Sequence, residues 1–165
     1  MKRLIIFDMD GAGEKLIPVK KDDFLFSARP EVHSCVGCFG CWIRTPGACV
    51  ISDRCEMIPR EISECDELWL ISRSLYGGHS QKVKAVLDRS IGYMLPYFRI
   101  ANGEMHHQKR YDHEFKYYSC YFGEMPEAEK EIADQLTKAN ALNMGISSYD
   151  TLFLKDERAV AEALL

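Results

Sequence analysis

Residues 67–89 read ELWLISRSLYGGHSQKVKAVLDR, and this stretch decides the fold. Its first six residues, 67–72, form a largely apolar run that is typical of a strand buried on both faces. After a short loop, apolar side chains recur at helical spacing, at Val83, Val86, Leu87 and Ile91. Ser80, just ahead of them, is the expected N-cap of that helix. A buried strand followed by an amphipathic helix is the repeating unit of a parallel sheet covered by helices.

The same alternation of strands and helices continues on either side. From their apolar or aromatic runs, strands are expected over residues 3–7, 116–122 and 150–154, with 23–27 a weaker candidate. Helices are expected over about 54–65, 126–144 and 156–165. The pattern predicts a single α/β domain over residues 1–165, with five parallel strands, residues 3–7 central, and helices on both faces. Ligands of such sheets bind beyond the carboxyl ends of the strands.

The longest expected helix lies between Pro126 and Gly145. The proline fits its first turn, and the glycine can end it. Its expected buried stripe consists of Ala128, Ile132, Leu136 and Ala139. In the 54–65 helix, Pro59 either opens the helix or kinks it.

Composition narrows the classes of function. The chain has 165 residues, 47% of them hydrophobic and 28% charged, and a net charge of −4, which indicates a globular protein without the cationic excess that attracts nucleic acid or anionic membranes. No apolar run approaches the roughly 18 residues that span a bilayer. The apolar run near the start, residues 4–7, is too short for a signal peptide. We therefore expect a cytoplasmic protein, in which clustered cysteines bind metal, act in redox chemistry or stay free.

The loop after residues 67–72 is the first candidate binding site. Gly77 and Gly78 let a ligand approach the backbone closely. The backbone N–H groups at the helix start favour a carbonyl-rich or anionic ligand. A tight strand-to-helix turn without a ligand explains the local sequence equally well.

Four of the seven cysteines lie within fifteen residues, in the pattern C-x2-C-x2-C-x7-C, at Cys35, Cys38, Cys41 and Cys49. The first three cysteines match the start of a bacterial ferredoxin run, although that run closes differently. Iron–sulfur ligands, zinc ligands, and small residues or reactive thiols all remain open. Cys65 and Cys120 are expected to be buried and inert.

The order of motifs between Cys35 and Tyr93, CVGCFGCW then PGACVISD, LYGG and KAVLDR, resembles the NADPH-dependent FMN reductase and iron–sulfur flavoprotein family of flavodoxin-like proteins. The resemblance implies a three-layer sandwich with strand order 2-1-3-4-5, FMN at the strand ends, and a homodimer. It implies NAD(P)H as electron donor, a small-molecule electron acceptor, and a possible [4Fe–4S] cluster on the four cysteines. The residues implied to line the flavin ring are Arg73, Ser74, Leu75, Tyr76, Gly77, Gly78, Phe122, Gly123 and Glu124.

The sequence departs from that family after the first strand. Family members carry a Gly-Ser-Pro-Arg-rich loop there, whose N–H groups hold the FMN phosphate. Here the loop is acidic, and Asp8 and Asp10 would repel a phosphate. The chain is thus identified as a divergent member that binds FMN weakly or holds the phosphate with other groups, such as Arg73 or Lys82.

Two further segments carry expectations. Residues 104–113 contain acidic residues and histidines, a composition that could bind a metal ion. Adjacent histidines on a strand point to opposite faces, however, and rarely bind the same ion. We therefore expect this segment to be an exposed loop that lies near the flavin or contacts a dimer partner. Residues 93–98, YMLPYF, are apolar and uncharged, and are the expected dimer contact.

Three functions remain open. The first is an FMN-dependent NAD(P)H oxidoreductase. The second is an iron–sulfur electron-transfer flavoprotein that uses the cysteine cluster. The third is a flavin-free scaffold or binding protein, because a fold does not fix a function.

Overall fold

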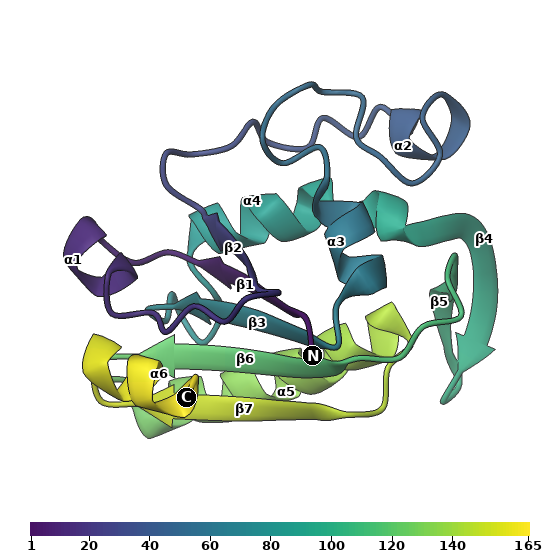
Figure 1. Cartoon of the computed structure of the whole chain (residues 1–165). Coiled ribbons are helices and arrows are strands. Elements are labelled where there is room, and N and C mark those ends of the chain that lie inside the picture. The colour runs from purple at the N-terminus through teal and green to yellow at the C-terminus, as the bar shows by residue number, and fades with distance from the viewer.

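The computed structural model describes all residues 1–165 and has a five-stranded parallel sheet at its centre (Figure 1). The strands are β1 (Arg3–Phe7), β2 (Phe24–Ser27), β3 (Glu67–Ser72), β6 (Lys116–Phe122) and β7 (Tyr149–Leu154). They lie in the order β2-β1-β3-β6-β7. Counting these strands alone, the order is the expected 2-1-3-4-5. The middle strand is β3, so the expectation that residues 3–7 would be central is wrong: β1 is interior, between β2 and β3.

Apolar side chains on both faces of the sheet explain why these segments are strands. All five residues of β1 are buried. Because side chains alternate along a strand, Leu4 and Ile6 join one core, while Ile5 and Phe7 join the other. The first core is closed by α3 (Ile58–Glu64), α4 (Gln81–Arg89) and α5 (Glu127–Met144); the second is closed mainly by α6 (Glu157–Ala163). The result is a three-layer sandwich.

The helix ends follow the expected signals. Ser80 caps α4 by accepting a hydrogen bond from the backbone N–H of Val83. Gly145, at φ +71°, ends α5. Pro59 lies in the first turn of α3 and opens that helix. No helix combines the length and the apolar character needed to cross a membrane. Two four-residue helices, α1 (Gly11–Glu14) and α2 (Gly40–Ile43), lie outside these layers.

The buried stripe of α5 differs from the expected one. Small residues, Ala133, Thr137 and Ala141, face the sheet. The larger Ile132 and Leu136 remain 44% and 42% exposed. Small side chains let the helix approach the sheet closely, and the large apolar ones then point along its flank. The stripe expected from the sequence had placed Ile132 and Leu136 against the sheet.

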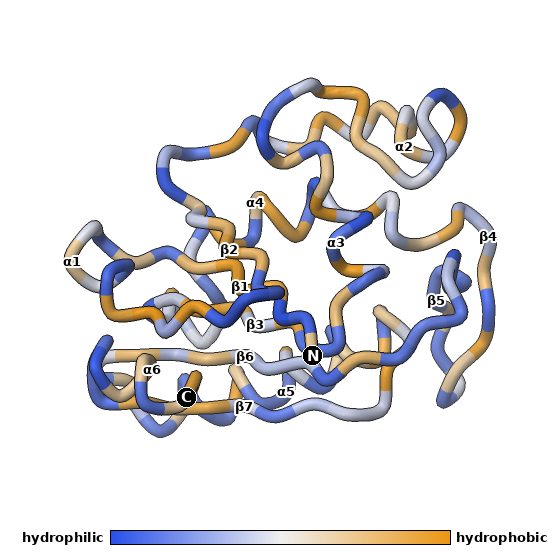
Figure 2. The backbone as a smooth tube through the Cα atoms, in the orientation of Figure 1, coloured by the Kyte–Doolittle hydropathy of each residue, from blue (hydrophilic) through white to orange (hydrophobic).

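An antiparallel hairpin replaces the loop expected over residues 104–113. Its strands are β4 (Met94–Ala101) and β5 (Glu104–Lys109), which follow the short 3-10 helix η1 (Ile91–Tyr93). The hairpin stands beside the main sheet, and hydrophobic and hydrophilic segments follow one another along β4 (Figure 2). The first part of YMLPYF is unavailable to a partner, because Tyr93 and Met94 are buried in the chain's own core.

Candidate functional site at the carboxyl ends of the strands

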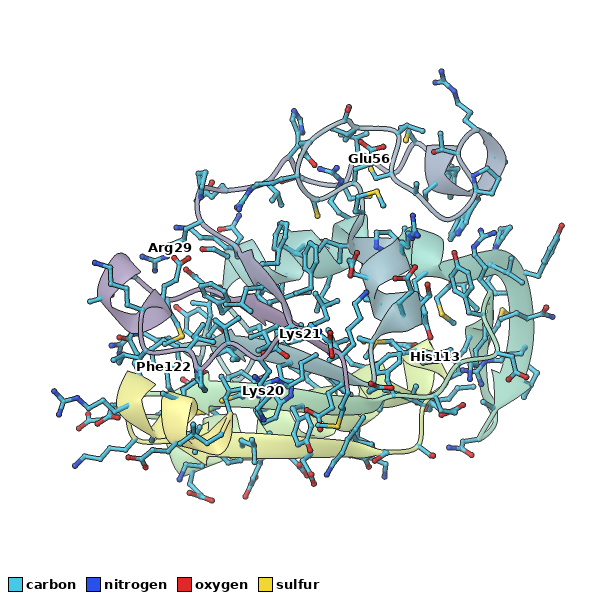
Figure 3. The ribbon with its side chains drawn as sticks, in the orientation of Figure 1. Lys20, Lys21, Arg29, Glu56, His113 and Phe122 are labelled. Carbon is cyan, nitrogen blue, oxygen red and sulfur yellow. The ribbon has the colours of Figure 1, made fainter.

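Two loops predicted to bind a flavin ring lie side by side. Strands β3 and β6 are neighbours, with Ser72 opposite Tyr121, so the residues after each strand meet at the same edge. The Arg73 guanidinium lies 5.3 Å from the centre of the Phe122 ring. Figure 3 shows Phe122 at the same end of the molecule as Arg29 and α1, and His113 toward the other end. The structure therefore brings the predicted ring residues of the two loops together.

The loop after β3 is a tight turn. The backbone groups of Leu75 and Gly78 exchange two hydrogen bonds, at 2.8 and 3.0 Å. Tyr76 and Gly77 between them have positive φ angles of 53° and 84°. This geometry pushes the Tyr76 side chain outward, where 84% of the residue is exposed. An exposed aromatic ring on a rigid turn can stack on a planar ligand.

Glu129, in the first turn of α5, holds this turn in place. Its carboxylate accepts a hydrogen bond from the Ser74 hydroxyl at 2.6 Å and from the Gly77 backbone N–H at 3.2 Å. The contact between Glu129 and the loop was not predicted from the sequence. A glutamate at the start of a helix that follows a strand end is the signal that could have found it.

His79 fixes the far end of the loop to the sheet. Its Nδ1 lies 2.9 Å from the Ser72 hydroxyl and its Nε2 lies 2.8 Å from the Ser119 hydroxyl. Its ring stacks on Tyr121, with the ring centres 4.4 Å apart. Burial lowers the pKa of His79 to about 3, so the ring is neutral at physiological pH. No sequence pattern predicted this role of His79.

The loop after β1 does not fit a phosphate. Asp10 accepts hydrogen bonds from the backbone N–H groups of Ala12 and Gly13 at 2.9 and 3.0 Å. The bonds from Gly13 and Ala12 lower the pKa of Asp10, so this carboxylate is ionised. Asp8 is paired with Arg29. Burial alone would raise the pKa of Asp8, but the hydrogen bonds from Arg29 and Ser80 outweigh it and lower the pKa. The N–H groups that a phosphate would need thus already hold a carboxylate.

The cysteine segment lies elsewhere. It leaves β2, passes over α4 and α3, and forms α2 before it returns to α3 (Figure 1), with hydrophobic stretches around α2 (Figure 2). Trp42 donates from Nε1 to the Met94 carbonyl at 2.9 Å. The Cys49 sulfur accepts from Arg89 Nε at 3.0 Å. Cys49 and Cys41 lie at the carboxyl end of α4 and the turn after it, against Arg89 and Gly92.

The structure contains no group of three or more histidine, cysteine, aspartate or glutamate residues placed to hold a metal ion. This holds for the four clustered cysteines and for the hairpin histidines. His106 is bonded to Asn143 at 2.7 Å and to Glu104 at 3.1 Å. His107 lies between the Trp42 and Phe98 rings. His113 donates to the Cys65 carbonyl.

A cavity of about 1130 Å³ connects the cysteine segment with α4 and α5. Its wall is mostly apolar and includes the exposed Leu136 of α5. It also includes Gly78 and His79 at one end and all four clustered cysteines: Cys35, Cys38, Cys41 and Cys49. A smaller cavity of about 360 Å³ is lined by Gly123 and Glu124 at the ends of β6 and β7.

No protein-family model matches the sequence. Iron-sulfur flavoprotein MJ1083 of Methanocaldococcus jannaschii is 34% identical over 77 residues, which are 44% of this chain and 39% of that protein. The match thus spans well under half of the relative's length.

Two solved structures share the fold. The crystal structure of Smu.1420 from Streptococcus mutans UA159 matches with a TM-score of 0.63 at 11% identity, over 99% of this chain and 96% of the other. The apo form of an NADH:FMN oxidoreductase (EMOB) matches with a TM-score of 0.52 at 13% identity, over 99% of this chain and 80% of the other. The fold is flavodoxin-like. At these identities the two likenesses show the fold alone.

Proposed function

We propose that this chain binds a flavin through its ring, at the loops after β3 and β6, and serves as an NAD(P)H-dependent oxidoreductase. The observation that carries the proposal is the joint placement of the two loops, fixed by Glu129 and by the stacking of Arg73 on Phe122. The partial similarity to an iron-sulfur flavoprotein supports the choice of ligand. We expect the protein to work in the cytoplasm.

In this proposal each part of the site has a separate task. Tyr76 stacks on the ring, and Gly77 and Gly78, which have no side chain, let the ring approach the backbone of the turn closely. Arg73, with Gly123 beside it, supplies a positive charge next to the ring. Bound flavin supplies the redox chemistry, taking a hydride from NAD(P)H and delivering electrons to a small acceptor.

The phosphate adds little to binding in this proposal. Because Asp10 occupies the N–H groups of α1, FMN and riboflavin are expected to bind with affinities within about fivefold of each other, each tenfold being worth about 1.4 kcal/mol. The test is a fluorescence titration with both flavins on wild type and on Arg73→Ala. FMN binding that is orders of magnitude tighter than riboflavin binding, and that survives Arg73→Ala, would contradict it.

The other two functions predict different spectra. The cysteines are not arranged as a metal site, which disfavours the iron–sulfur hypothesis, although the relative is named an iron-sulfur flavoprotein. A visible spectrum of anaerobically purified protein separates the cases. Flavin absorbs near ~450 and ~370 nm, and a [4Fe–4S] cluster shows a broad shoulder near ~400 nm. A colourless protein that binds neither flavin would favour the scaffold.

We also propose that the chain forms a homodimer through the outer part of the hairpin. Tyr97, Phe98, Ile100 and Met105 are 64%, 58%, 71% and 67% exposed. Exposed apolar side chains gathered on one hairpin are typical of a protein contact. Light scattering at micromolar concentration should give twice the chain mass, and Ile100→Lys should halve it. Ile43→Lys, at an equally exposed position on α2, is the control; a monomeric wild type would contradict the proposal.

A further inference from the structure

The cysteine segment contains a pair of thiols in different surroundings. Cys41 and Cys49 are both half-buried, whereas Cys35 and Cys38 are exposed and Cys55, Cys65 and Cys120 are buried. Burial raises the pKa of each of these last three to about 12, so they stay protonated at neutral pH. Cys41 and Cys49 are thus the half-buried thiols in the cavity wall, beside the exposed Cys35 and Cys38.

Cys49 contacts a fully buried cation. The Arg89 side chain has no exposed surface, and its Nε donates to the Cys49 sulfur at 3.0 Å. The remaining N–H groups bind the Asp53 carboxylate at 2.8 and 2.9 Å and the carbonyls of His33 and Ile51. A thiolate accepts a hydrogen bond from guanidinium far better than a thiol does. Arg89 thus places a hydrogen-bond donor directly against this sulfur.

A closed turn connects Cys41 with the residues just before Cys49. The Gly47 N–H donates to the Cys41 carbonyl at 3.0 Å. A Cβ placed on Gly92 would meet the Cys41 Cβ at 3.2 Å and the Ala48 nitrogen at 3.6 Å, so both sides of the turn pack on Gly92. Burial, and after it the charge of Cys49, raises the pKa of Cys41. Both cysteines lie in the wall of the large cavity, and Cys41 is the one held as a neutral thiol.

We propose that Cys49 and Cys41 form a thiol–disulfide exchange pair that reduces low-molecular-weight disulfides entering the large cavity. The Cys49 thiolate attacks one sulfur of the disulfide RSSR, forming a bond to it and releasing RS⁻, which takes up a proton. The Cys41 thiol then loses its proton to solvent and attacks the Cys49 sulfur, which releases the second RS⁻. Two protein thiols are oxidised to one disulfide, and RSSR is reduced to two RSH. This chemistry is independent of flavin.

The test uses 5,5′-dithiobis(2-nitrobenzoate) as the disulfide, on a parent protein in which Cys35→Ser and Cys38→Ser remove the exposed thiols. The parent should release two thionitrobenzoates per chain, retain no adduct, and give a peptide map with a Cys41–Cys49 link. Cys41→Ser should release one and keep the adduct on Cys49. Cys49→Ser should react at least about tenfold more slowly.

Three outcomes would overturn the proposal. The first is a Cys49→Ser protein that reacts at the parental rate. The second is a Cys41→Ser protein that still loses its adduct. The third is a peptide map that links Cys49 to Cys55, the buried neighbour. Arg89→Lys, checked for folding by circular dichroism, keeps the charge and removes the Nε donor. A folded Arg89→Lys protein should react several-fold more slowly. An unchanged rate would show that Arg89 does not activate Cys49.

Discussion

The two candidate sites lie at opposite ends of α4. The ring loop adjoins the start of the helix at Ser80, and the thiol pair adjoins its end at Arg89. A helix of nine residues separates them by about 13 Å along its axis. The ring loop is shaped by its own backbone turn and anchored by Glu129 and His79. The cysteine segment contains no strand, and the Arg89 guanidinium of α4 hydrogen-bonds it at His33, Cys49 and Ile51.

This difference shows how the same helix supports two kinds of site. A turn that depends on positive φ angles is sensitive to the addition of a single methyl group. A loop gathered around one buried charge is sensitive to the loss of that charge or of its counter-ion. Changes at one end of α4 should therefore leave the other end intact, and each variant below probes that separation.

The largest effect is expected at the cysteine end, from Asp53→Asn. The substitution leaves the buried Arg89 charge without a full counter-ion, which should destabilise the fold by about 3 kcal/mol and lower Tm by roughly 6–12 °C. Riboflavin affinity should stay within about twofold, because the ring loop is at the other end of the helix. Thermal unfolding and flavin titration of the same samples check both statements.

The effect of Asp53→Asn should depend on pH. The hydrogen bond from Arg89 is the largest cause that lowers the pKa of Asp53 in the folded chain. A carboxyl with a lowered pKa stabilises the fold above its unfolded pKa of about 3.9, and this contribution is lost as the pH falls through the lower, folded value. The difference between wild type and variant should thus be full at pH 7 and shrink below about pH 4. Glu64→Gln, which breaks surface pairs with Arg60 and Lys2, is the control and should change Tm little.

The next largest effect is expected from Gly77→Ala. Gly77 has φ +84°, and a Cβ there would lie 2.6 Å from Ile132 and 3.0 Å from the Glu129 carbonyl oxygen. The change should cost about 2 kcal/mol of stability and displace the turn, which weakens riboflavin binding by about tenfold. The neighbouring Gly78→Ala is a matched control, because its nearest contact would be an ordinary 3.6 Å. Equal losses for the two variants would show that the turn does not shape the site.

Much of this fold follows from the sequence because parallel strands carry a strong signal. The continuous apolar runs of β1, β3 and β6 match the expected bounds, since each strand is buried on both faces. The hairpin was missed because β5, with its two histidines and mixed burial, has no such run. The face of α5 was misassigned because helical periodicity does not tell whether small or large side chains meet the sheet.

The candidate site was only partly predictable. The ring residues could be named because they directly follow strands, and strand ends gather at one edge. The acidic loop after β1 was expected to reject phosphate, and Asp10 shows how, by capping α1 itself. The contacts of Glu129, His79 and Arg89 depend on how distant elements meet in space. The position of Glu129 in the first turn of α5 is a partial signal, but the local sequence does not specify the partners of His79 and Arg89.

A smaller effect is expected from Glu129→Gln. The amide removes the charge that holds the Ser74 hydroxyl and the Gly77 N–H, so the turn should loosen. Losing one charge-assisted hydrogen bond at about 1 kcal/mol should weaken riboflavin binding about fivefold. Glu131→Gln, on the exposed side of the same helix, should bind as wild type does. If both variants bind equally well, Glu129 does not position the ring loop.

The smallest effect is expected from Asp10→Asn. This variant compares most directly how the flavin ring and the phosphate contribute to binding. The amide can still cap α1 through its oxygen, so the loop should keep its shape while one negative charge leaves the phosphate side. FMN should then bind about threefold more tightly, because a phosphate no longer meets a carboxylate at a helix start, whereas riboflavin should be unaffected.

Asp156→Asn is the matched control for that variant. Asp156 caps α6 in the same way, through the N–H groups of Arg158 and Ala159 at 3.0 Å each, but lies on a different helix. Both substitutions remove one charge from the chain, so a general electrostatic effect on FMN would appear in both. An effect confined to Asp10 would place the phosphate at α1, where the carboxylate now opposes it. Equal FMN affinities in wild type, Asp10→Asn and Asp156→Asn would mean that a bound FMN directs its phosphate away from α1 altogether, and Arg73 would then be the group to vary next.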